Sequence, residues 1–252
     1  MNKFLVDIIL PVYNSENFIL KTIESILKQN FKSWRLMIVD DNSLDNSYNI
    51  IKNNYSIYIK KKKFFLYQNS INRGQGFSRN LLLTKTKAKY IAFIDSDDFW
   101  KPNKLSEQIN FMKENKYDFT FTDYKVLKAN KKISTIKASN FFNYNNFVND
   151  TCIATSTIIL NRKAIGKLRF PNIRLCEDYL FKCNLLKKFS AFNLCKANTY
   201  YCIRKNSLQS YRLRVLFAVW KINRDFNNMS LFQNLLSVFF ISLNSLKKYG
   251  LR

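Results

Sequence analysis

Three acidic groups in the sequence have residue types and a spacing that could do chemistry. They are Asp40-Asp41, Asp95-Ser96-Asp97-Asp98 and Glu177-Asp178. They stand out because the chain of 252 residues carries 42 Lys and Arg against 17 Asp and Glu, a net charge of +25. Carboxylates one residue apart can hold a hard divalent metal ion, which takes oxygen ligands and often completes its shell with substrate phosphates. A solvated turn is the alternative, since Asp is a preferred turn residue.

The absence of histidine removes a large group of mechanisms. The sequence contains no His, so an imidazole cannot act as acid, base or metal ligand, and Ser-His-Asp and Cys-His catalysis are excluded. The five cysteines show no Cys-x-x-Cys spacing, which argues against a disulfide scaffold or a structural zinc site. We therefore expect reduced thiols in a cytoplasmic protein, with proton transfer left to a carboxylate, Lys, Tyr or Cys.

The first hundred residues alternate between strand and helix patterns. Apolar runs at 6–10, 34–39, 64–67 and 90–94, interrupted only by Asp7 and Arg35, have strand length, and helical spacing of apolar residues lies between them. Ser15 is the expected N-cap of the first helix. Strands that alternate with helices on short connections predict an α/β fold with a mostly parallel sheet covered on both faces. Ligands of such sheets bind at the carboxyl ends of the strands, where Asp41 and Asp95 fall.

The second half of the sequence is less regular. The pattern predicts a helix at 104–115, a strand at 118–124, a polar insertion at 125–149 and a strand at 157–160. Glu177 and Asp178 begin a predicted helix at 177–188, where carboxylates in the first turn interact favourably with the helix dipole. From residue 211 onward we expect helix. This last segment carries an apolar stripe of Phe232, Leu235, Leu236, Phe239, Phe240, Leu243 and Leu246.

The sequence predicts neither a cleaved signal peptide nor a membrane span. The apolar run near the N-terminus is short and is broken by Asp7. No stretch reaches the roughly 18 apolar residues that a span needs. Basic residues flank the apolar stripe on both sides, which suits an amphipathic helix lying on the anionic inner face of the cytoplasmic membrane. Packing of the stripe on the rest of the chain or on a partner subunit is the alternative.

The order of several short segments resembles glycosyltransferase family 2, whose members are inverting enzymes of the GT-A fold. The segments are Leu10-Pro11-Val12-Tyr13-Asn14, Val39-Asp40-Asp41-Asn42-Ser43, Asn72-Arg73-Gly74 with Ser78-Arg79-Asn80, Tyr90 to Asp98, and Glu177-Asp178. The resemblance runs from about residue 6 to 201 and implies a Rossmann-like, mostly parallel sheet flanked by helices. It implies a catalytic domain at 1–210, with a nucleotide-sugar half at 1–103 and an acceptor half at 104–210, followed by a helical extension at 211–252.

The resemblance implies a pocket for the base and ribose of a nucleotide-sugar donor. Pro11, Tyr13 and Asn14 would line this pocket, with Tyr13 stacked on the base. Asp41 would accept a hydrogen bond from the base edge, and a carboxylate there selects an N–H donor such as uracil N3. We therefore expect a UDP-sugar. For Tyr13, packing on the next helix as a strand-edge aromatic side chain is the alternative.

The segment around residues 72–82 is implied to shape the phosphate end of the donor. Asn72 and Gly74 would form the loop, and Arg79 would lie near the donor phosphates or the ribose. A surface arginine on a helix is the alternative for Arg79. Family members commonly carry another glycine where Leu82 stands, and some supply a histidine to the metal that this chain lacks.

The two remaining acidic groups are implied to do the chemistry. Asp95 and Asp97, with Ser96 between them, correspond to the metal and ribose motif, and Asp97 is favoured as the direct ligand of Mn²⁺ or Mg²⁺. Asp178 would be the general base that takes the proton from an acceptor hydroxyl, while Glu177 orients the base or the acceptor. The alternative for this pair is a structural role, as two carboxylates that compensate the helix dipole.

The resemblance implies transfer of a sugar to a hydroxyl of a glycan or lipid-linked acceptor in bacterial surface polysaccharide assembly, such as lipopolysaccharide or capsule. One alternative is a sugar-phosphate nucleotidylyltransferase, but such enzymes open with a glycine-rich phosphate loop and residues 10–18 contain no glycine. A nucleic-acid-binding protein is the other alternative, yet the basic residues are spread over the chain without a recognisable motif. We expect no nucleic acid partner, and the sequence leaves the donor sugar, acceptor and oligomeric state open.

Overall fold

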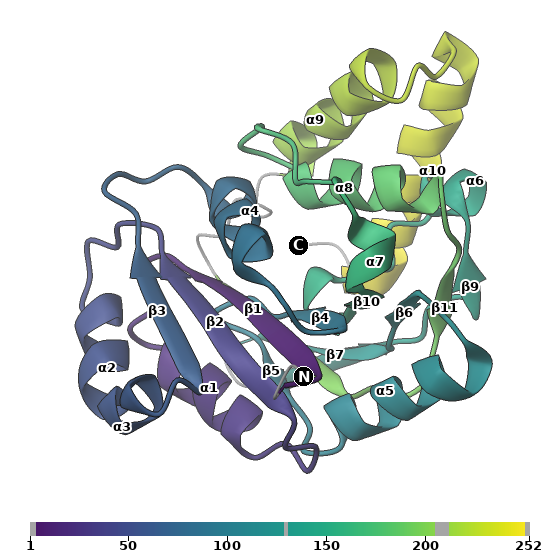
Figure 1. Cartoon of the computed structure of the whole chain (residues 1–252). Coiled ribbons are helices and arrows are strands. Elements are labelled where there is room, and N and C mark those ends of the chain that lie inside the picture. Colours follow the sequence, from purple (N-terminus) through teal and green to yellow (C-terminus); the bar gives the residue numbers. More distant parts are fainter. Residues whose placement is uncertain (1–3, 129–130, 205–211, 250–252) are drawn as a thin grey trace.

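The computed structural model of the chain describes residues 4–128, 131–204 and 212–249. Within these residues the strands form an eight-stranded sheet in the order β3-β2-β1-β4-β10-β6-β11-β9 and a four-stranded sheet in the order β5-β12-β7-β8 (Figure 1). The strands are β1 Val6–Val12, β2 Trp34–Asp40, β3 Phe64–Gln68, β4 Tyr90–Phe93, β5 Phe99–Trp100, β6 Phe119–Phe121, β7 Tyr124–Lys128, β8 Lys131–Ile136, β9 Phe141–Phe142, β10 Ile159–Asn161, β11 Ala191–Asn193 and β12 Thr199–Ile203. The helices are α1 Ile19–Leu27, α2 Ser47–Asn54, α3 Ser56–Lys60, α4 Gln75–Lys85, α5 Lys104–Asn115, α6 Tyr144–Phe147, α7 Arg162–Ile165, α8 Glu177–Leu186, α9 Arg212–Asp225 and α10 Leu231–Tyr249, with a 3-10 turn, η1, at Thr155–Thr157.

The first half of the large sheet has the parallel arrangement that the sequence predicts. β3, β2, β1 and β4 are parallel neighbours in that order. Every residue of β1 is buried. Strands that are buried on both faces consist of continuous apolar runs instead of alternating ones, which is why these strands could be located from the sequence. The α/β fold is therefore confirmed.

The second half of the large sheet mixes strand directions. β10 is antiparallel to both of its neighbours, β4 and β6. β11 is parallel to β6 but antiparallel to β9. The chain leaves the large sheet after β6, forms the β7–β8 hairpin of the small sheet, returns to the large sheet at β9 and reaches β10 through α6 and η1. Because β6 and β10 are not joined as a single strand–helix–strand unit, β10 is free to enter in the opposite direction.

The predicted polar insertion at 125–149 is wrong, because this segment contains β7, β8, β9 and α6. Several of its apolar residues occupy buried positions, such as Val126, Ile136 and Phe142. Asn and Lys occupy the intervening positions, so the composition resembles a loop although the spacing supports strands. The small sheet also pairs β5, which directly follows the acidic run, with β12 near residue 200.

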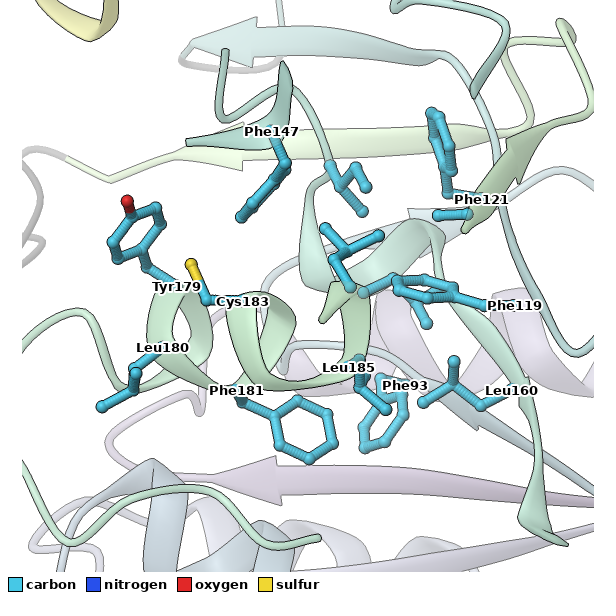
Figure 2. Packing of buried hydrophobic residues seen from close by; sticks show 14 of the residues in the cluster. Phe93, Phe119, Phe121, Phe147, Leu160, Tyr179, Leu180, Phe181, Cys183 and Leu185 are labelled. Carbon is cyan, nitrogen blue, oxygen red and sulfur yellow. The ribbon is translucent and has the colours of Figure 1, made fainter. Parts of the chain in front are cut away.

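Two apolar clusters cover opposite faces of the large sheet. Ile8 and Leu10 of β1 belong to one cluster, and Ile9 between them belongs to the other, as expected for side chains that alternate across a strand. Figure 2 shows α8 packed into the second cluster, with Phe181 and Leu185 of α8 directed toward Phe93 of β4. The tight packing of α8 fixes the position of its first turn, which carries Glu177 and Asp178.

The C-terminal helices α9 and α10 pack on the preceding part of the chain through α8 and residues 148–150. Tyr179 of α8 donates a hydrogen bond from its hydroxyl to Asn223 Oδ1 of α9 at 2.8 Å. Ser237 of α10 donates to the carbonyl oxygen of Val148 at 2.6 Å. Of the helices that the structure describes, none combines the length and apolar character needed to span a membrane.

Candidate active site

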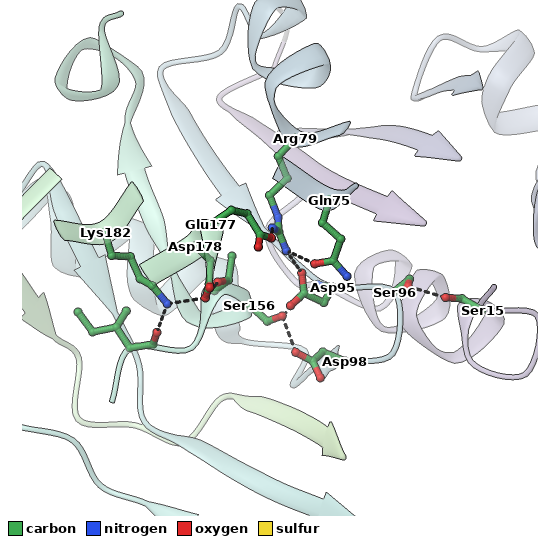
Figure 3. A network of polar contacts seen from close by, with 12 residues as sticks. Ser15, Gln75, Arg79, Asp95, Ser96, Asp98, Ser156, Glu177, Asp178 and Lys182 are labelled. Atoms are coloured by element: carbon green, nitrogen blue, oxygen red, sulfur yellow. Dashed lines mark hydrogen bonds and ion pairs between the residues drawn. The ribbon is translucent and has the colours of Figure 1, made fainter. Parts of the chain in front are cut away.

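The predicted site residues meet at one edge of the large sheet. Tyr13 follows β1, Asp41 follows β2 and Asp95 follows β4, and these three strands are parallel neighbours. The first turn of α8 brings Glu177 and Asp178 to the same edge, where Glu177 contacts Arg79 of the nucleotide-sugar half (residues 1–103, the donor half below) and Asp178 contacts Thr155 (Figure 3). The carboxyl ends of the strands thus gather acidic groups that lie far apart in the sequence, as predicted.

Arg79 joins the two halves of the site. Its side chain is only 2% exposed. One guanidinium nitrogen, Nη2, donates to Asp95 Oδ1 at 2.7 Å and to Gln75 Oε1 at 2.9 Å, and the other, Nη1, donates to Glu177 Oε1 at 3.0 Å. Arg79 lies inside α4, which begins at Gln75, so it faces the site from the second turn of this helix. In this structure its partners are carboxylates, and the contact with donor phosphates stays a prediction.

The 3-10 turn η1 connects the acidic run to the proposed base. Ser156 Oγ accepts a hydrogen bond from the backbone N–H of Asp95 at 3.0 Å and donates to the carboxylate of Asp98. Thr155 Oγ1, one residue earlier, donates to Asp178 Oδ2 at 3.1 Å. Asp98 also accepts from the backbone N–H of Cys202 at 2.9 Å. Two consecutive hydroxyls therefore set the position of the base relative to the acidic run, and Figure 3 shows Ser156 between Asp95 and Asp98.

Asp178 is held in its ionised form. Lys182, one turn further along α8, donates from Nζ to Asp178 Oδ2 at 2.8 Å and to the carbonyl oxygen of Ile153 at 2.8 Å. Burial alone would raise the pKa of Asp178, but the Lys182 ion pair, supported by Arg79 and the Thr155 hydroxyl, lowers the pKa to about 2. The side chain is 27% exposed, so a substrate group can reach it.

Glu177 is more deeply placed than Asp178 and is tied to Arg79. Its side chain is 12% exposed. Burial and the neighbouring Asp178 raise the pKa of Glu177, while Arg79 opposes this shift. Gly76 of α4 makes room for it, because a Cβ atom at that position would lie 2.9 Å from Glu177 Cγ. Cys176, the N-cap of α8, has a φ of 61°, a left-handed conformation that is uncommon for a residue other than glycine.

Asp41 organises the loop at 72–74. Its Oδ1 accepts hydrogen bonds from Asn69 Nδ2 at 2.7 Å and from the backbone N–H of Arg73 at 3.0 Å. Its Oδ2 accepts a hydrogen bond from the backbone N–H of Gly74 at 2.7 Å. Asn72 Nδ2 donates to the Asp41 carbonyl oxygen at 3.2 Å. Gly74 has a φ of +90°, a conformation that L side chains rarely adopt. The predicted loop-shaping role of Asn72 and Gly74 agrees with this geometry, and the contact of Asp41 with a base stays a prediction.

The residues after β1 lie beside the acidic run. Pro11 is buried within β1, whereas Tyr13 is 38% exposed and is available for stacking. Asn14 has a φ of 46°, and its Oδ1 accepts from the backbone N–H of Leu44 at 2.8 Å. The hydroxyls of Ser15 and Ser96 are 2.6 Å apart, which ties this turn to the acidic run. The prediction of Ser15 as the N-cap of the first helix is wrong, because α1 begins at Ile19 and its N-cap is Phe18.

Asp97 forms an ion pair with Arg204, a residue that the sequence analysis missed. Arg204 Nε lies 2.6 Å from Asp97 Oδ2. The same guanidinium donates to the carbonyl oxygen of Asn14 at 3.2 Å and to Ser15 Oγ at 3.0 Å. Burial raises the pKa of Asp97 to about 6 even though Arg204 acts in the opposite direction. A cation other than a metal therefore partly balances the acidic run in this structure.

The donor set fits a divalent metal ion only in part. Among the described residues no group of three or more His, Cys, Asp or Glu side chains is arranged to hold a metal. The side chains of Asp95 and Asp97 are 23% and 20% exposed, however, and Mg²⁺ is commonly bound by one or two carboxylates together with substrate phosphates. These residues therefore fit a metal ion that arrives with the donor and completes its shell with phosphate oxygens.

Four residues of the site gave little or no signal in the sequence. Lys182 could have been found, since it lies four residues after Asp178 on the same helix, a spacing at which opposite charges pair. Thr155 and Ser156 belong to a short run of small polar residues without a pattern. Arg204 directly follows β12, and only the pairing of β12 with β5 and β7 brings this residue to the site.

An α/β sheet with carboxylates at the ends of its parallel strands, and a further aspartate beside them, is the arrangement expected of a glycosyltransferase of the GT-A fold. The family model for glycosyl transferase family 2 matches residues 7–168. The chain therefore belongs to glycosyl transferase family 2 and is a glycosyltransferase. This finding decides against the nucleotidylyltransferase and nucleic-acid-binding alternatives.

Relatives and solved structures agree with this assignment. The chain is 31% identical over 229 residues to a UDP-Glc:alpha-D-GlcNAc-diphosphoundecaprenol beta-1,3-glucosyltransferase of Escherichia coli, a match covering 90% of this chain and 88% of the relative. The fold is similar to that of S. aureus TarS in complex with UDP-GlcNAc, with a TM-score of 0.70, 20% identity, and coverage of 96% of this chain and 72% of TarS. It is also similar to the mannosyltransferase PcManGT of Pyrobaculum calidifontis in complex with GDP-Man and Mn²⁺, with a TM-score of 0.70, 14% identity, and coverage of 98% and 70%.

Proposed function

We propose that the protein is an inverting glycosyltransferase that moves a sugar from a UDP-sugar to a hydroxyl of a lipid-linked acceptor in the assembly of a bacterial surface polysaccharide. The observation that carries the proposal is Asp178, which Lys182 and Thr155 hold ionised beside the acidic run 95–98. The name of the E. coli relative supports a UDP-sugar donor and a diphosphoundecaprenol-linked acceptor.

Asp178 is the proposed general base. Its Oδ2 accepts the bonds from Lys182 and Thr155, which leaves Oδ1 to take the proton of the acceptor hydroxyl. The hydroxyl oxygen attacks the anomeric carbon from the face opposite the diphosphate, the bond from that carbon to the diphosphate breaks, and the configuration inverts. The second carboxylate, on Glu177, is paired with Arg79, so it holds the base and the donor half in register without itself accepting the proton.

Asp95 and Asp97 are the proposed ligands of a divalent cation, Mn²⁺ or Mg²⁺, bound together with the donor phosphates. When bound, the ion stabilises the negative charge of the leaving diphosphate, so no protonating acid is needed. Ser96 and Asp95 would lie near the ribose, while Tyr13, Asn14 and Pro11 form the pocket for the base. We further propose that residues 1–210 form the catalytic unit, that 211–252 are an attached helical extension, and that the protein works in the cytoplasm.

Asp178→Asn tests the proposed base. The substitution keeps the size of the side chain but removes its basicity, so donor affinity should stay within about threefold of wild type. Transfer should fall about 10²- to 10⁴-fold, the usual contribution of a positioned base. Donor binding is measured by titration calorimetry with UDP-sugars and Mn²⁺, and transfer by release of UDP.

Asp225→Asn is the matched control, since Asp225 is exposed at the end of α9, and it should behave as wild type. An Asp178→Asn variant that keeps more than a tenth of wild-type turnover would contradict the proposed base. A variant that no longer binds donor would show instead that Asp178 is structural.

A further inference from the structure

The helix α10 packs on the protein through polar side chains. Asn234 Nδ2 donates to the carbonyl oxygen of Trp220 at 3.0 Å and Asn244 Nδ2 to that of Asn149 at 3.1 Å. Lys248 Nζ donates to Asp150 Oδ1 at 2.6 Å. Asn234, Ser237, Asn244 and Lys248 follow one another at intervals of three, seven and four residues, which places them along one side of the helix. The inward side of α10 combines these polar residues with Ile241 and Val238, which pack on the apolar core cluster, so it is more polar than that of an ordinary surface helix.

The outward side of α10 is apolar. The stripe predicted from the sequence lies on this side. From Phe232 to Leu243 its exposure ranges from 37% at Leu243 to 70% at Phe232, whereas Leu246 at its end is only partly exposed. Leu213 and Phe217, one turn apart on α9, are 84% and 70% exposed. The exposed apolar residues of the two helices, which we together call the outer face, are Leu213, Phe217, Leu231, Phe232, Leu235, Leu236, Phe239, Phe240 and Leu243. Scattered exposed apolar residues are normal, but a row of Phe and Leu along one helix side marks an interaction surface.

Exposed basic residues accompany the outer face. Residues 212–249 contain six Lys and Arg and a single acidic residue, Asp225. Lys221, Arg224 and Lys247 are exposed. A second copy of the chain would place the same positive charges opposite one another, which disfavours association. An anionic lipid surface satisfies both the apolar side chains and the basic residues, as in helices that lie in the plane of a membrane interface.

The position of the two helices relative to the site suits a membrane-bound acceptor. Asn223 of α9 accepts the hydroxyl hydrogen bond of Tyr179, the residue directly after Asp178. Figure 1 shows α9 and α10 on the side of the molecule that carries α8, at the opposite end from α2 and α3. The outer face is therefore attached to the helix that carries the proposed base, on the acceptor half of the enzyme.

We infer that the outer face of α9 and α10 docks on an anionic lipid bilayer, with the Phe and Leu side chains inserted at the level of the headgroups and the basic residues next to acidic lipid. This inference rests on the proposed function in one respect, since a lipid-linked acceptor gives the docking its purpose. Membrane binding is nevertheless a property that can be measured without any transfer reaction.

Vesicle flotation of the full chain tests the inference. The protein should float with vesicles of phosphatidylcholine and phosphatidylglycerol in equal parts at low salt. It should float far less with phosphatidylcholine alone, and binding should weaken as salt rises. Phe232→Ser/Phe239→Ser should lower the partition coefficient about tenfold or more, because binding strength scales with the apolar area that inserts. The outward position of both side chains means that this variant should keep the wild-type circular dichroism spectrum and melting temperature.

Leu44→Ser/Ile57→Ser is the matched control, since these apolar side chains are 83% and 63% exposed but lie outside the outer face. It should float as wild type does. Lys221→Glu/Lys247→Glu should lose binding to the anionic vesicles while keeping all apolar residues. The inference is overturned if wild type stays unbound at low salt, or if the control loses binding as much as Phe232→Ser/Phe239→Ser. It is also overturned if sedimentation shows a dimer that Phe232→Ser/Phe239→Ser abolishes, since a second copy would then cover the face. Flotation without transferase activity would contradict the proposed function alone.

Discussion

Replacing Lys182 with Met should move the acidic limb of the pH–rate profile upward. In wild type the Lys182 ion pair outweighs the effect of burial and lowers the pKa of Asp178 from 3.8 to about 2. That lowering corresponds to about 2.5 kcal/mol in favour of the ionised form, at 1.36 kcal/mol for each pH unit. In Lys182→Met burial acts with less opposition, so the pKa of Asp178 should rise above 3.8 and the acidic limb should shift by about two pH units or more.

Lys182→Met should also change how the free energy of unfolding depends on pH. The folded-state pKa of Asp178 lies below its unfolded value, so the wild-type ion pair stabilises the fold above the unfolded pKa of 3.8. This contribution is lost as the pH falls from about 5 to 2. The free energy of unfolding of Lys182→Met should therefore be lower at neutral pH and should fall less steeply in acid.

The assay is kcat as a function of pH under saturating substrates, together with urea unfolding at each pH. At neutral pH Asp178 is ionised in both proteins, so kcat of the variant should stay within about tenfold of wild type. In the variant Asp178 is held less firmly in place, but its higher pKa makes it a stronger base, which compensates in part. Lys188→Met is the matched control, because Lys188 is exposed just beyond α8, and its profile should match wild type. An acidic limb that does not move in Lys182→Met would refute Asp178 as the group whose ionisation limits transfer.

Two further predictions concern the donor half. Arg79→Lys should lower the free energy of unfolding by about 2 kcal/mol or more and turnover by about tenfold or more, because a lysine cannot reach both Asp95 and Glu177 and leaves one buried carboxylate unpaired. Urea unfolding and UDP release measure this, and wild-type stability in the variant would contradict the bridging role. Asp97→Ala should abolish metal-dependent turnover, as should an excess of chelator on wild type, while the chain stays folded because Asp97 and its partner Arg204 are both partly exposed. Full activity of either sample would exclude the metal.

The strands of the donor half were predictable because each is a continuous apolar run that ends in a polar turn. Residues 6–10 and 34–39 have this pattern and form the centre of the parallel sheet. Their order fixes which turns meet, so the sequence placed Asp41 and Asp95 at one edge correctly. Helix α5 was also predicted with its bounds, because its apolar residues follow a helical spacing.

The acceptor half was harder because its short strands depend on tertiary pairing. β9 has two residues and β6 and β11 have three each, too few for a periodic signal. The contacts of Ser156 with Asp95 and Asp98 join residues about sixty positions apart. The apolar stripe of α10 could be located in the sequence, but the hydrogen bonds of the polar residues of α10 decide that the stripe points away from the protein. Ser237 and Asn244 find backbone carbonyl groups of 148–149, and no local pattern could predict that.

The most direct test of the central claim is the anomeric configuration of the product. Purified protein is incubated with an α-linked UDP-sugar, Mn²⁺ and a diphosphate-lipid acceptor analogue, and the new linkage is identified by the proton coupling of its anomeric signal. Attack assisted by Asp178 from the face opposite the diphosphate predicts a β-linked product in wild type and no product in Asp178→Asn. An α-linked product would contradict single-displacement transfer with Asp178 as the base.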